Sequence, residues 1–327
     1  MRVRYFLGID TGGTKSHALI ANEEGCAVGF AEGGPGNPQG IGYPALTQLF
    51  SIIVNQAVAH AGISISDIAG AGFGIGGYDW SSERVTLLES IAPLGLRAQI
   101  EIVNDTTLGI LAGATEGWGV AVVSGTGCNC RGWDRQHREG RVIGNGYLVA
   151  EGAGASELVV KAIQAIALEW TRRGPATQLT AAFSEHFGYS NREQLMEYLT
   201  NSRDWGKISA AAPVVFQVAA QGDVVAGELI PWAGRELASL AIGVIRQLEL
   251  EAESFDVVLV GSVFNGSPLV IETMDECVRA VAPRARLVRL ATVPAVGAVM
   301  LGMQQAGVDA IPLRENLMRT TNHLHQE

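Results

Sequence analysis

The sequence predicts an α/β protein built from two related halves. Short apolar strands alternate with helical segments along its 327 residues, which is the pattern of α/β architecture. Each half also contains an apolar strand, a turn rich in glycine and threonine, and a second strand. The two turns are GGT at 12–14 and GTG at 125–127. The length fits about two domains, and we expect the hinge between them near 113–118.

The first half opens with an apolar strand that runs directly into a polar turn, IDTGGTKS at 9–16. The hairpin that follows is expected to turn at Glu24 and Gly25, and the first long helix is expected to stop at Gly62. The predicted elements are, in order, a strand at 3–9, a hairpin over 16–34, a helix at 44–61, strands at 69–75 and 98–105, and a helix at 106–117.

The second half repeats the strand and hairpin and then becomes helical. Its hairpin begins at 119–133 and is expected to turn at Glu139 and Gly140. The tail at 315–327 is expected to be loosely ordered. The other predicted elements are helices at 155–171, 175–186, 191–200, 208–221 and 224–252, strands at 255–266 and 287–293, and a final helix at 294–307.

Composition excludes several classes of function. The formal net charge of −10 argues against binding to nucleic acid or to an anionic membrane surface. No apolar run reaches the roughly 20 residues needed to span a bilayer, and no apolar signal segment precedes the Asp10 turn. The four cysteines have no zinc or disulfide spacing, so we expect reduced thiols. A cytoplasmic location is therefore predicted.

Three common site patterns are absent or weak. GFGIGG at 72–77 formally matches a dinucleotide-binding turn, but it does not open the first βα unit, so we interpret it as a strand packed closely against a neighbouring backbone. No Walker A sequence occurs. The six histidines show neither H-x-x-x-H nor H-E-x-x-H spacing, so their spacing predicts no metal-hydrolase centre.

The two glycine and threonine turns are candidate phosphate sites. Glycine allows the backbone to approach a phosphate, successive amides form an anion nest, and a Thr hydroxyl or Lys15 can add a further contact. Asp10 lies too close to the expected phosphates to bind them, so we expect it to hold Mg²⁺ through water. Asp105, at the end of a strand, is a candidate general base, although capping of the helix that follows also explains it. GSVFNG at 261–266 offers a glycine surface for a purine.

These motifs resemble those of the sugar kinase/actin/Hsp70 superfamily. The chain is most similar to N-acetylglucosamine kinases of the BadF/BadG/BcrA/BcrD-type ATPase family, which also holds the ATPases that activate benzoyl-CoA reductase. The resemblance covers nearly the whole chain and rests on GIDTGGTKS (8–16), GPGNPQG (34–40), GFGIGGYD (72–79), VNDTT (103–107), SGTGCNC (124–130), LVGSVFNG (259–266) and PAVGA (294–298).

The resemblance implies a fold and a domain division. The expected fold has two actin-like (ribonuclease H-like) domains with a cleft between them. The N-terminal domain comprises residues 1–116 and the C-terminal helix at about 294–327. The C-terminal domain comprises residues 117–293 and carries the adenosine site.

The resemblance also implies the roles of individual residues. ATP phosphates are expected at two motifs, adenosine at a third, and the sugar beside the catalytic base, Asp105. The implied contacts are Gly12, Gly13, Thr14 and Lys15 for the first phosphate motif, Gly125, Thr126 and Gly127 for the second, Gly261 and Ser262 for adenosine, and Asn37 for the sugar.

One segment departs from the family pattern. Sugar kinases of this type have GGWG…GDEGS, where Trp and Asp touch the sugar, whereas this chain has GNGYLVAEGAGAS at 144–156. After Gly144, Asn145 takes the place of the Trp and Glu151 that of the Asp. Because Asn145 is polar, we expect a preference for a sugar with a polar or absent N-substituent. A local shift that places Tyr147 at the sugar is the alternative.

The sequence thus predicts an ATP-dependent kinase of an amino sugar or related hexose. ATP and Mg²⁺ are the expected cofactors, a small sugar is the expected partner, and a homodimer is the expected assembly. Two other classes stay open. One is an ATPase that activates a redox enzyme through an iron–sulfur cluster, although Cys128 and Cys130 lie inside the phosphate turn. The other is a sensor that binds sugar or nucleotide without catalysis.

Overall fold

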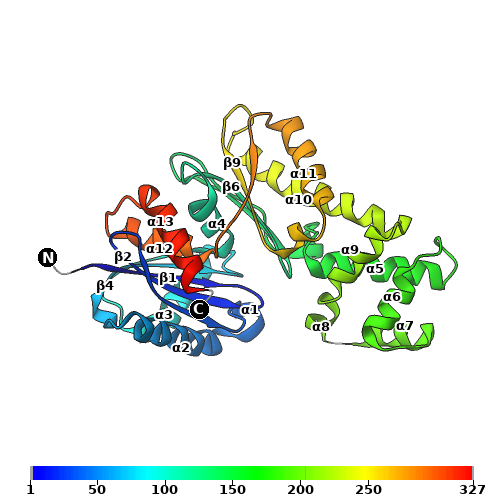
Figure 1. Cartoon of the computed structure of the whole chain (residues 1–327), viewed down its shortest axis with the longest axis horizontal. Helices are drawn as coiled ribbons and strands as arrows, with labels where there is room; N and C mark the ends of the chain where they lie inside the picture. Colours follow the sequence, from blue (N-terminus) through cyan, green and yellow to red (C-terminus); the bar gives the residue numbers. More distant parts are fainter. Residues whose placement is uncertain (1–2, 203, 326–327) are drawn as a thin grey trace.

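Two five-stranded mixed sheets organise the chain (Figure 1). The computed structural model describes residues 3–202 and 204–325. In the first sheet the strand order is β3-β2-β1-β4-β5, where β1 pairs antiparallel with β2 and parallel with β4. Its strands are β1 Tyr5–Thr11, β2 Ser16–Asn22, β3 Ala27–Gly33, β4 Ile68–Ile75 and β5 Gln99–Asn104.

The second sheet repeats the connectivity of the first. Its order is β10-β9-β6-β7-β8, so each half consists of an antiparallel three-stranded meander followed by two parallel strands. The two related halves predicted from the turn motifs are therefore confirmed at the level of topology. The strands are β6 Gly119–Ser124, β7 Cys128–Trp133, β8 Glu139–Arg141, β9 Asp256–Val260 and β10 Arg286–Arg289.

Helices cover both faces of the first sheet. On one face α2 (Tyr43–Ala61) and α3 (Arg84–Ile91) pack over apolar side chains of β1 and β4, and the short α1 (Pro38–Ile41) precedes them. On the other face α12 (Ala295–Gln305) lies so close to the strands that a Cβ at Gly72 would come within 2.2 Å of the Ala298 carbonyl oxygen. This contact confirms the interpretation of GFGIGG as a closely packed strand.

Helix α4 (Asp105–Gly113) connects the two sheets. It contacts β4 and β5 of the first sheet and β6, β7 and β9 of the second. A Cβ at Gly109 would lie 2.9 Å from Val260 in β9, so the absence of a side chain allows the close approach. The far side of the second sheet is covered by α10 (Val224–Gln247) and α11 (Pro268–Val281).

A helical segment is inserted between β8 and α10. Its core includes Leu158, Phe183, Leu195 and Val215, so it has an apolar interior of its own. In Figure 1 it forms the green lobe beside the second sheet. Its helices are α5 Ala155–Trp170, α6 Leu179–Phe187, α7 Arg192–Asn201, α8 Trp205–Ser209 and α9 Ala212–Ala220.

Two predicted elements of the second half were wrong. The helix at 208–221 is interrupted, because Pro213 starts a new helix, α9, in its first turn. The second hairpin does not turn at Glu139 and Gly140, which lie in β8. Its turn is fixed instead by Asp134, whose Oδ1 accepts from the amides of Gln136 and Arg138.

The expectation of a loose tail was also wrong. Residues Arg314–Leu324 form α13, which packs against β3 and buries Leu317 and Thr321. The expectation for 326–327 falls outside the described residues.

No single helix in the described ranges is long and apolar enough to cross a membrane. The segments 205–220 and 224–247 meet the length and composition criteria only as a pair, which is bent by 117°.

Candidate active site

A cavity of about 860 Å³ lies where the carboxyl ends of β1, β4, β6 and β9 meet. Residues that follow these strands line it, which is the usual position of ligands in open α/β sheets. Most of the predicted site residues line this cavity, namely Asp10, Gly12, Gly13, Thr14, Lys15, Asn37, Asp105, Gly125, Thr126, Gly127, Gly144, Gly261 and Ser262.

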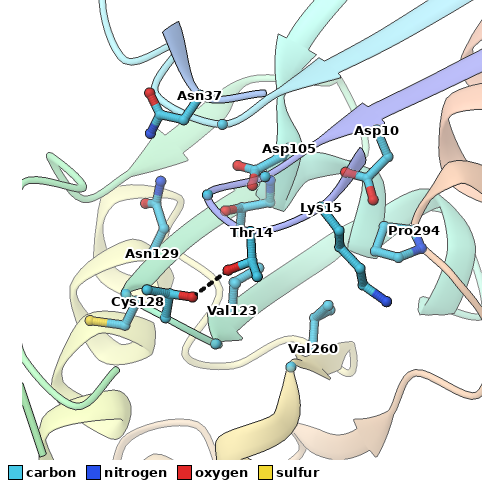
Figure 2. Close-up of a pocket in the computed structure, with 18 of the residues that line it drawn as sticks. Asp10, Thr14, Lys15, Asn37, Asp105, Val123, Cys128, Asn129, Val260 and Pro294 are labelled. Atoms are coloured by element: carbon cyan, nitrogen blue, oxygen red, sulfur yellow. Dashed lines mark hydrogen bonds between the residues drawn. The ribbon is translucent and has the colours of Figure 1, made fainter. Parts of the chain in front are cut away.

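The two predicted phosphate turns touch each other. The hydroxyls of Thr14, after β1, and Thr126, after β6, are 2.7 Å apart and share a hydrogen bond, drawn as a dashed line in Figure 2. These residues are 112 positions apart in the chain. The duplicated topology therefore brings the two hairpin turns together from opposite sides of the cavity.

Glycines in these turns leave space beside the backbone. A Cβ placed at Gly13, Gly125 or Gly127 would meet no atom within 4 Å. Packing within the protein therefore does not explain a glycine at these positions, whereas access for a ligand does. By contrast, a Cβ at Gly76 would lie 3.1 Å from Oδ2 of Asp105, so that glycine makes room for the carboxylate.

Backbone hydrogen bonds fix both turns. The amides of Ala155 and Ser156, in the first turn of α5, donate to the carbonyls of Gly125 and Thr126 at 2.8 and 3.0 Å. On the other side, the amide of Gly36 donates to the Gly12 carbonyl at 2.9 Å. Each turn is thus held from behind, and both Thr hydroxyls face the cavity.

Two carboxylates, Asp10 and Asp105, stand together in the cavity wall (Figure 2). Asp105 begins α4, and its Oδ1 accepts from the Thr106 amide at 2.9 Å. Burial, followed by the negative charge of Asp10, raises the pKa of Asp105 to about 7. A carboxyl group with this pKa is suited to accept a proton near neutral pH.

Capping of α4 is done by a neighbour of Asp105. Asn104 is the N-cap residue, and its Oδ1 accepts from the Thr106 amide at 3.1 Å. The helix start therefore does not depend on Asp105 alone, which leaves its Oδ2 available to the cavity.

Lys15 and Asn37 line opposite parts of the cavity. The Lys15 side chain extends toward Val260 and Pro294 in Figure 2, and within the described chain it forms no ion pair. Asn37 caps the short α1, where its Oδ1 accepts from the Gln39 amide at 2.9 Å. A Cβ at Gly77 would lie 2.5 Å from that Oδ1, so a glycine is needed beside it.

Sequence reasoning missed a polar network that joins the two sheets across the cavity. Asp79, after β4, accepts a 2.6 Å hydrogen bond from the guanidinium of Arg131 in β7, whose side chain is 1% exposed. Asn104 donates to Asp79 at 3.2 Å, and Asn129 donates to Asn104 at 3.4 Å. Asp79 ends the motif GFGIGGYD, and Asn129 lies in SGTGCNC, so both residues belong to motifs that carry the family resemblance.

The predicted adenosine motif lies against the second turn. Gly261 has φ +112°, and a Cβ there would come within 2.2 Å of the Ser124 carbonyl oxygen, so a glycine is required. Arg289 donates to the Gly261 carbonyl and to Asn265 at 3.3 and 2.6 Å. A second, largely apolar cavity of about 820 Å³ opens beside this loop and shares Thr14, Thr126 and Ser262 with the first.

The segment that departs from the family pattern is folded around Glu151. Glu151 is 5% exposed, and its carboxylate accepts from the amides of Ile143, Gly144 and Asn145 at 2.7, 2.6 and 3.0 Å. Of the residues predicted to contact sugar here, the described cavity lining includes Gly144 but not Asn145, Glu151 or Tyr147. The contacts of Glu151 indicate that it shapes the loop.

Two sheets of equal topology, facing one cavity with a hairpin turn from each, define the class of actin-like two-domain folds. The fold class predicted from the sequence is confirmed by solved structures. A protein from Chromobacterium violaceum, described as a putative N-acetylglucosamine kinase, superposes with a TM-score of 0.72 at 22% identity and covers 92% of this chain and 99% of its own.

The chain belongs to the BadF/BadG/BcrA/BcrD ATPase family, whose model matches residues 7–302. The predicted resemblance is thereby confirmed. An N-acetylmuramic acid/N-acetylglucosamine kinase of Clostridium acetobutylicum is 23% identical over 304 residues, with 93% of this chain and 99% of that protein covered. An N-acetyl-D-glucosamine kinase of Dictyostelium discoideum is 22% identical over 316 residues, again with 93% and 99% covered.

Proposed function

We propose that this protein is an ATP-dependent kinase that phosphorylates an amino sugar or related hexose. The observation that carries the proposal is the contact between Thr14 and Thr126, which brings both turns to one cavity beside Asp10 and Asp105. The family membership and the amino-sugar kinases among the relatives support the same conclusion.

The triphosphate would lie between the two turns. Its oxygens would replace the Thr14–Thr126 hydrogen bond with one bond from each hydroxyl, and the space beside Gly13 and Gly125 would admit them. Lys15 would add a positive charge. The apolar cavity beside Ser262 and Phe216 has the character of a purine site, which supports adenine binding there.

Asp10 would hold Mg²⁺ through water. The carboxylate oxygens of Asp10 suit a hard cation. The charge of Asp10 raises the pKa of Asp105, and a divalent ion held by Asp10 would offset that repulsion. When bound, Mg²⁺ would neutralise charge on the phosphate oxygens.

Asp105 would act as the general base. Its carboxylate would take the proton of the acceptor hydroxyl as that oxygen forms a bond to the γ-phosphorus, and ADP would leave with the electrons of the broken bond. The acceptor would lie near Asn37, Asp79 and Asn129, which supply polar groups on that side of the cavity.

The domain division and cellular setting are proposed on simpler grounds. The first sheet ends at Asn104, the second begins at Gly119, and α12 packs on the first, which supports domains of 1–116 plus 294–327 and of 117–293.

The four cysteines are free thiols, which supports a cytoplasmic location. A homodimer is proposed, with no nucleic acid or membrane partner. Light scattering of the purified protein measures the assembly.

A coupled ADP-release assay over hexoses and hexosamines tests the kinase assignment. We expect sugar-dependent ADP formation with at least one amino sugar. ADP release that no sugar stimulates would contradict the assignment.

The same panel tests the sugar preference. Asn145, from which this preference was first predicted, is not in the described cavity lining. Because Asn37, Asp79 and Asn129 give the acceptor side a polar lining of its own, kcat/KM is still expected to be higher for glucosamine or glucose than for N-acetylglucosamine, whose methyl group would face these polar side chains. The opposite order would reject this predicted preference and leave the kinase assignment intact.

The Thr14→Val and Thr126→Val variants test the phosphate turns. Each is expected to weaken ATP binding by about 1.5–3 kcal/mol, or about 10- to 150-fold in Kd, because a hydrogen bond to a charged group is lost. Calorimetric titration of ATP measures the change. Thr200→Val, in α7 where the hydroxyl bonds to carbonyls of its own helix, should bind ATP normally. Normal ATP affinity in both turn variants would remove the turns from the phosphate site.

The alternative function, an ATPase that activates a redox enzyme through an iron–sulfur cluster, has less support. Cys130 is fully buried, and the Sγ of Cys128 donates to the Gly152 carbonyl at 2.9 Å. Burial raises the pKa of Cys128 to about 12, so its thiolate is disfavoured. These two cysteines are therefore poorly placed to ligate a cluster shared with a partner. Iron analysis of anaerobically purified protein tests this alternative.

A further inference from the structure

Three titratable side chains lie in one row across the first sheet. Asp10 in β1 is directly opposite His17 in β2, and His17 is directly opposite Glu32 in β3. Side chains at directly opposed positions point to the same face of a sheet. The row therefore starts at the cavity with Asp10 and ends at the sheet edge with Glu32, which is half exposed.

His17 is buried without a conventional hydrogen bond. Its side chain is 2% exposed, and neither ring nitrogen has a hydrogen-bond partner among the described residues 3–202 and 204–325. Nδ1 lies 3.6 Å from Oδ2 of Asp10, and Nε2 lies 3.4 Å from Oε2 of Glu32. A buried polar group without a partner is costly, so this arrangement calls for a ligand.

The C-terminal helix brings a second imidazole to the same place. His325 follows α13, and its Nε2 lies 4.0 Å from the same Glu32 oxygen. The helix is fastened to the β2–β3 hairpin, since the Ala27 amide donates to Thr320 and the Asn316 amide group donates to the Glu24 carbonyl, both at 3.0 Å. The position of His325 thus follows from the packing of α13.

The geometry points to a divalent transition-metal site, with Zn²⁺ as the preferred ion, formed by His17, Glu32 and His325. One ligand atom from each residue lies within 4.8 Å of the other two. Zinc bonds of about 2.0–2.2 Å in tetrahedral geometry place ligand atoms about 3.4 Å apart, which matches the His17–Glu32 distance. Two imidazoles and one carboxylate favour zinc over Mg²⁺ or Ca²⁺.

The surroundings fit such a site in two further respects. Metal-bound histidines usually direct their other nitrogen to a carboxylate, and the Nδ1 of His17 faces Asp10. Glu32 and His325 are 52% and 37% exposed, so an ion has access from solvent and water can take a fourth position. The ion would tie the C-terminal helix to the row and orient His17 against Asp10.

Sequence spacing gives no sign of this site, because its ligands come from β2, β3 and the end of α13. Ring packing is the competing explanation. The His17 and His325 rings lie 5.5 and 5.1 Å from that of Phe30, and such contacts hold the helix without a metal. The two explanations differ in whether zinc binds with one-to-one stoichiometry.

Titration of the full-length, tag-free protein with ZnCl₂ in excess Mg²⁺ tests the site. We expect one Zn²⁺ per chain, and an increase in Kd of at least about 100-fold in His325→Gln and in Glu32→Gln, since the loss of a ligand should exceed the 10- to 100-fold cost of losing an outer partner. His323→Gln is the matched control, because His323 is exposed on the same helix and outside the cluster. It should bind zinc as the unaltered protein does.

A spectroscopic readout is independent of activity. Zinc at Nε2 of His17 leaves the proton on Nδ1, so the ¹⁵N resonances of that ring should shift to the pattern of a single neutral tautomer, and His325→Gln should abolish the shift. Failure to bind stoichiometric zinc, or an unchanged zinc affinity in the His325→Gln and Glu32→Gln variants, would overturn the proposal. Sugar-dependent ADP release is a separate measurement, so either proposal can fail alone.

Discussion

Asp105→Asn is expected to lower kcat about 10²- to 10⁴-fold with little change in ATP affinity. The range is that of general acid–base catalysis, which the amide removes while keeping the shape of the side chain. The carboxamide oxygen of the variant can still accept from the Thr106 amide, and Asn104 still caps α4, so the wall of the cavity should keep its form. Steady-state kinetics with saturating sugar, together with calorimetric ATP binding, measure both quantities.

Thermal stability provides the control for folding in this variant. The pKa of Asp105 is about 7 in the folded chain against 3.8 as its ordinary value, so the folded state retains a proton that the unfolded chain loses between these pH values. The stability of the unaltered protein therefore falls, relative to Asp105→Asn, as pH rises from about 4 to 7, and the difference is constant above that.

The difference in Tm between variant and unaltered protein should accordingly grow in favour of the variant up to about pH 7. Scans in buffers with a chelator measure it. A flat difference would show that the pKa of Asp105 is not raised. A variant that is stable but retains most of its kcat would remove Asp105 from the mechanism.

Local patterns explain why the strands and turns were predictable. Each turn follows an apolar strand immediately in sequence, and the class of fold then brings the ends of parallel strands to one edge. Thr14 and Thr126 could therefore be expected at the same cavity from their motifs alone. The three-stranded meander of each half was also predictable from local patterns. The exception is the second hairpin turn, which Asp134 forms rather than a Glu-Gly pair.

Long-range contacts explain what the sequence did not reveal. Asp79 and Arg131 are 52 positions apart, and no spacing rule pairs a residue after β4 with one in β7. Glu151 shows the opposite case, since a carboxylate aligned with a sugar ligand turned out to accept three amides of its own loop. The tail was missed because only Leu317 and Thr321 of α13 are buried, too few to produce a clear helical pattern.

Arg131→Met is expected to lower the free energy of unfolding by about 3–5 kcal/mol, the cost of breaking a buried ion pair. Its guanidinium bonds to Asp79 at 2.6 Å, and the two side chains are 1% and 8% exposed. Burial already raises the pKa of Asp79, and Arg131 is the main influence that lowers it. Without the arginine, the Asp79 carboxylate would be buried without its countercharge. Urea denaturation at pH 8, where the carboxyl must ionise in the unfolded chain, measures the loss.

The Asp79→Asn/Arg131→Met double variant separates the pair from its surroundings. Removing both charges should restore most of the stability, because the cost arises from the uncompensated partner rather than from the absence of the pair. Arg279→Met is the matched control: it breaks the Arg279–Asp275 pair, whose side chains are 52% and 34% exposed, and should cost about 0.3–0.5 kcal/mol. A loss below about 1 kcal/mol in Arg131→Met would contradict the role of this pair. Since Asp79 also lines the acceptor side of the cavity, sugar KM is expected to rise in the double variant even where stability has returned.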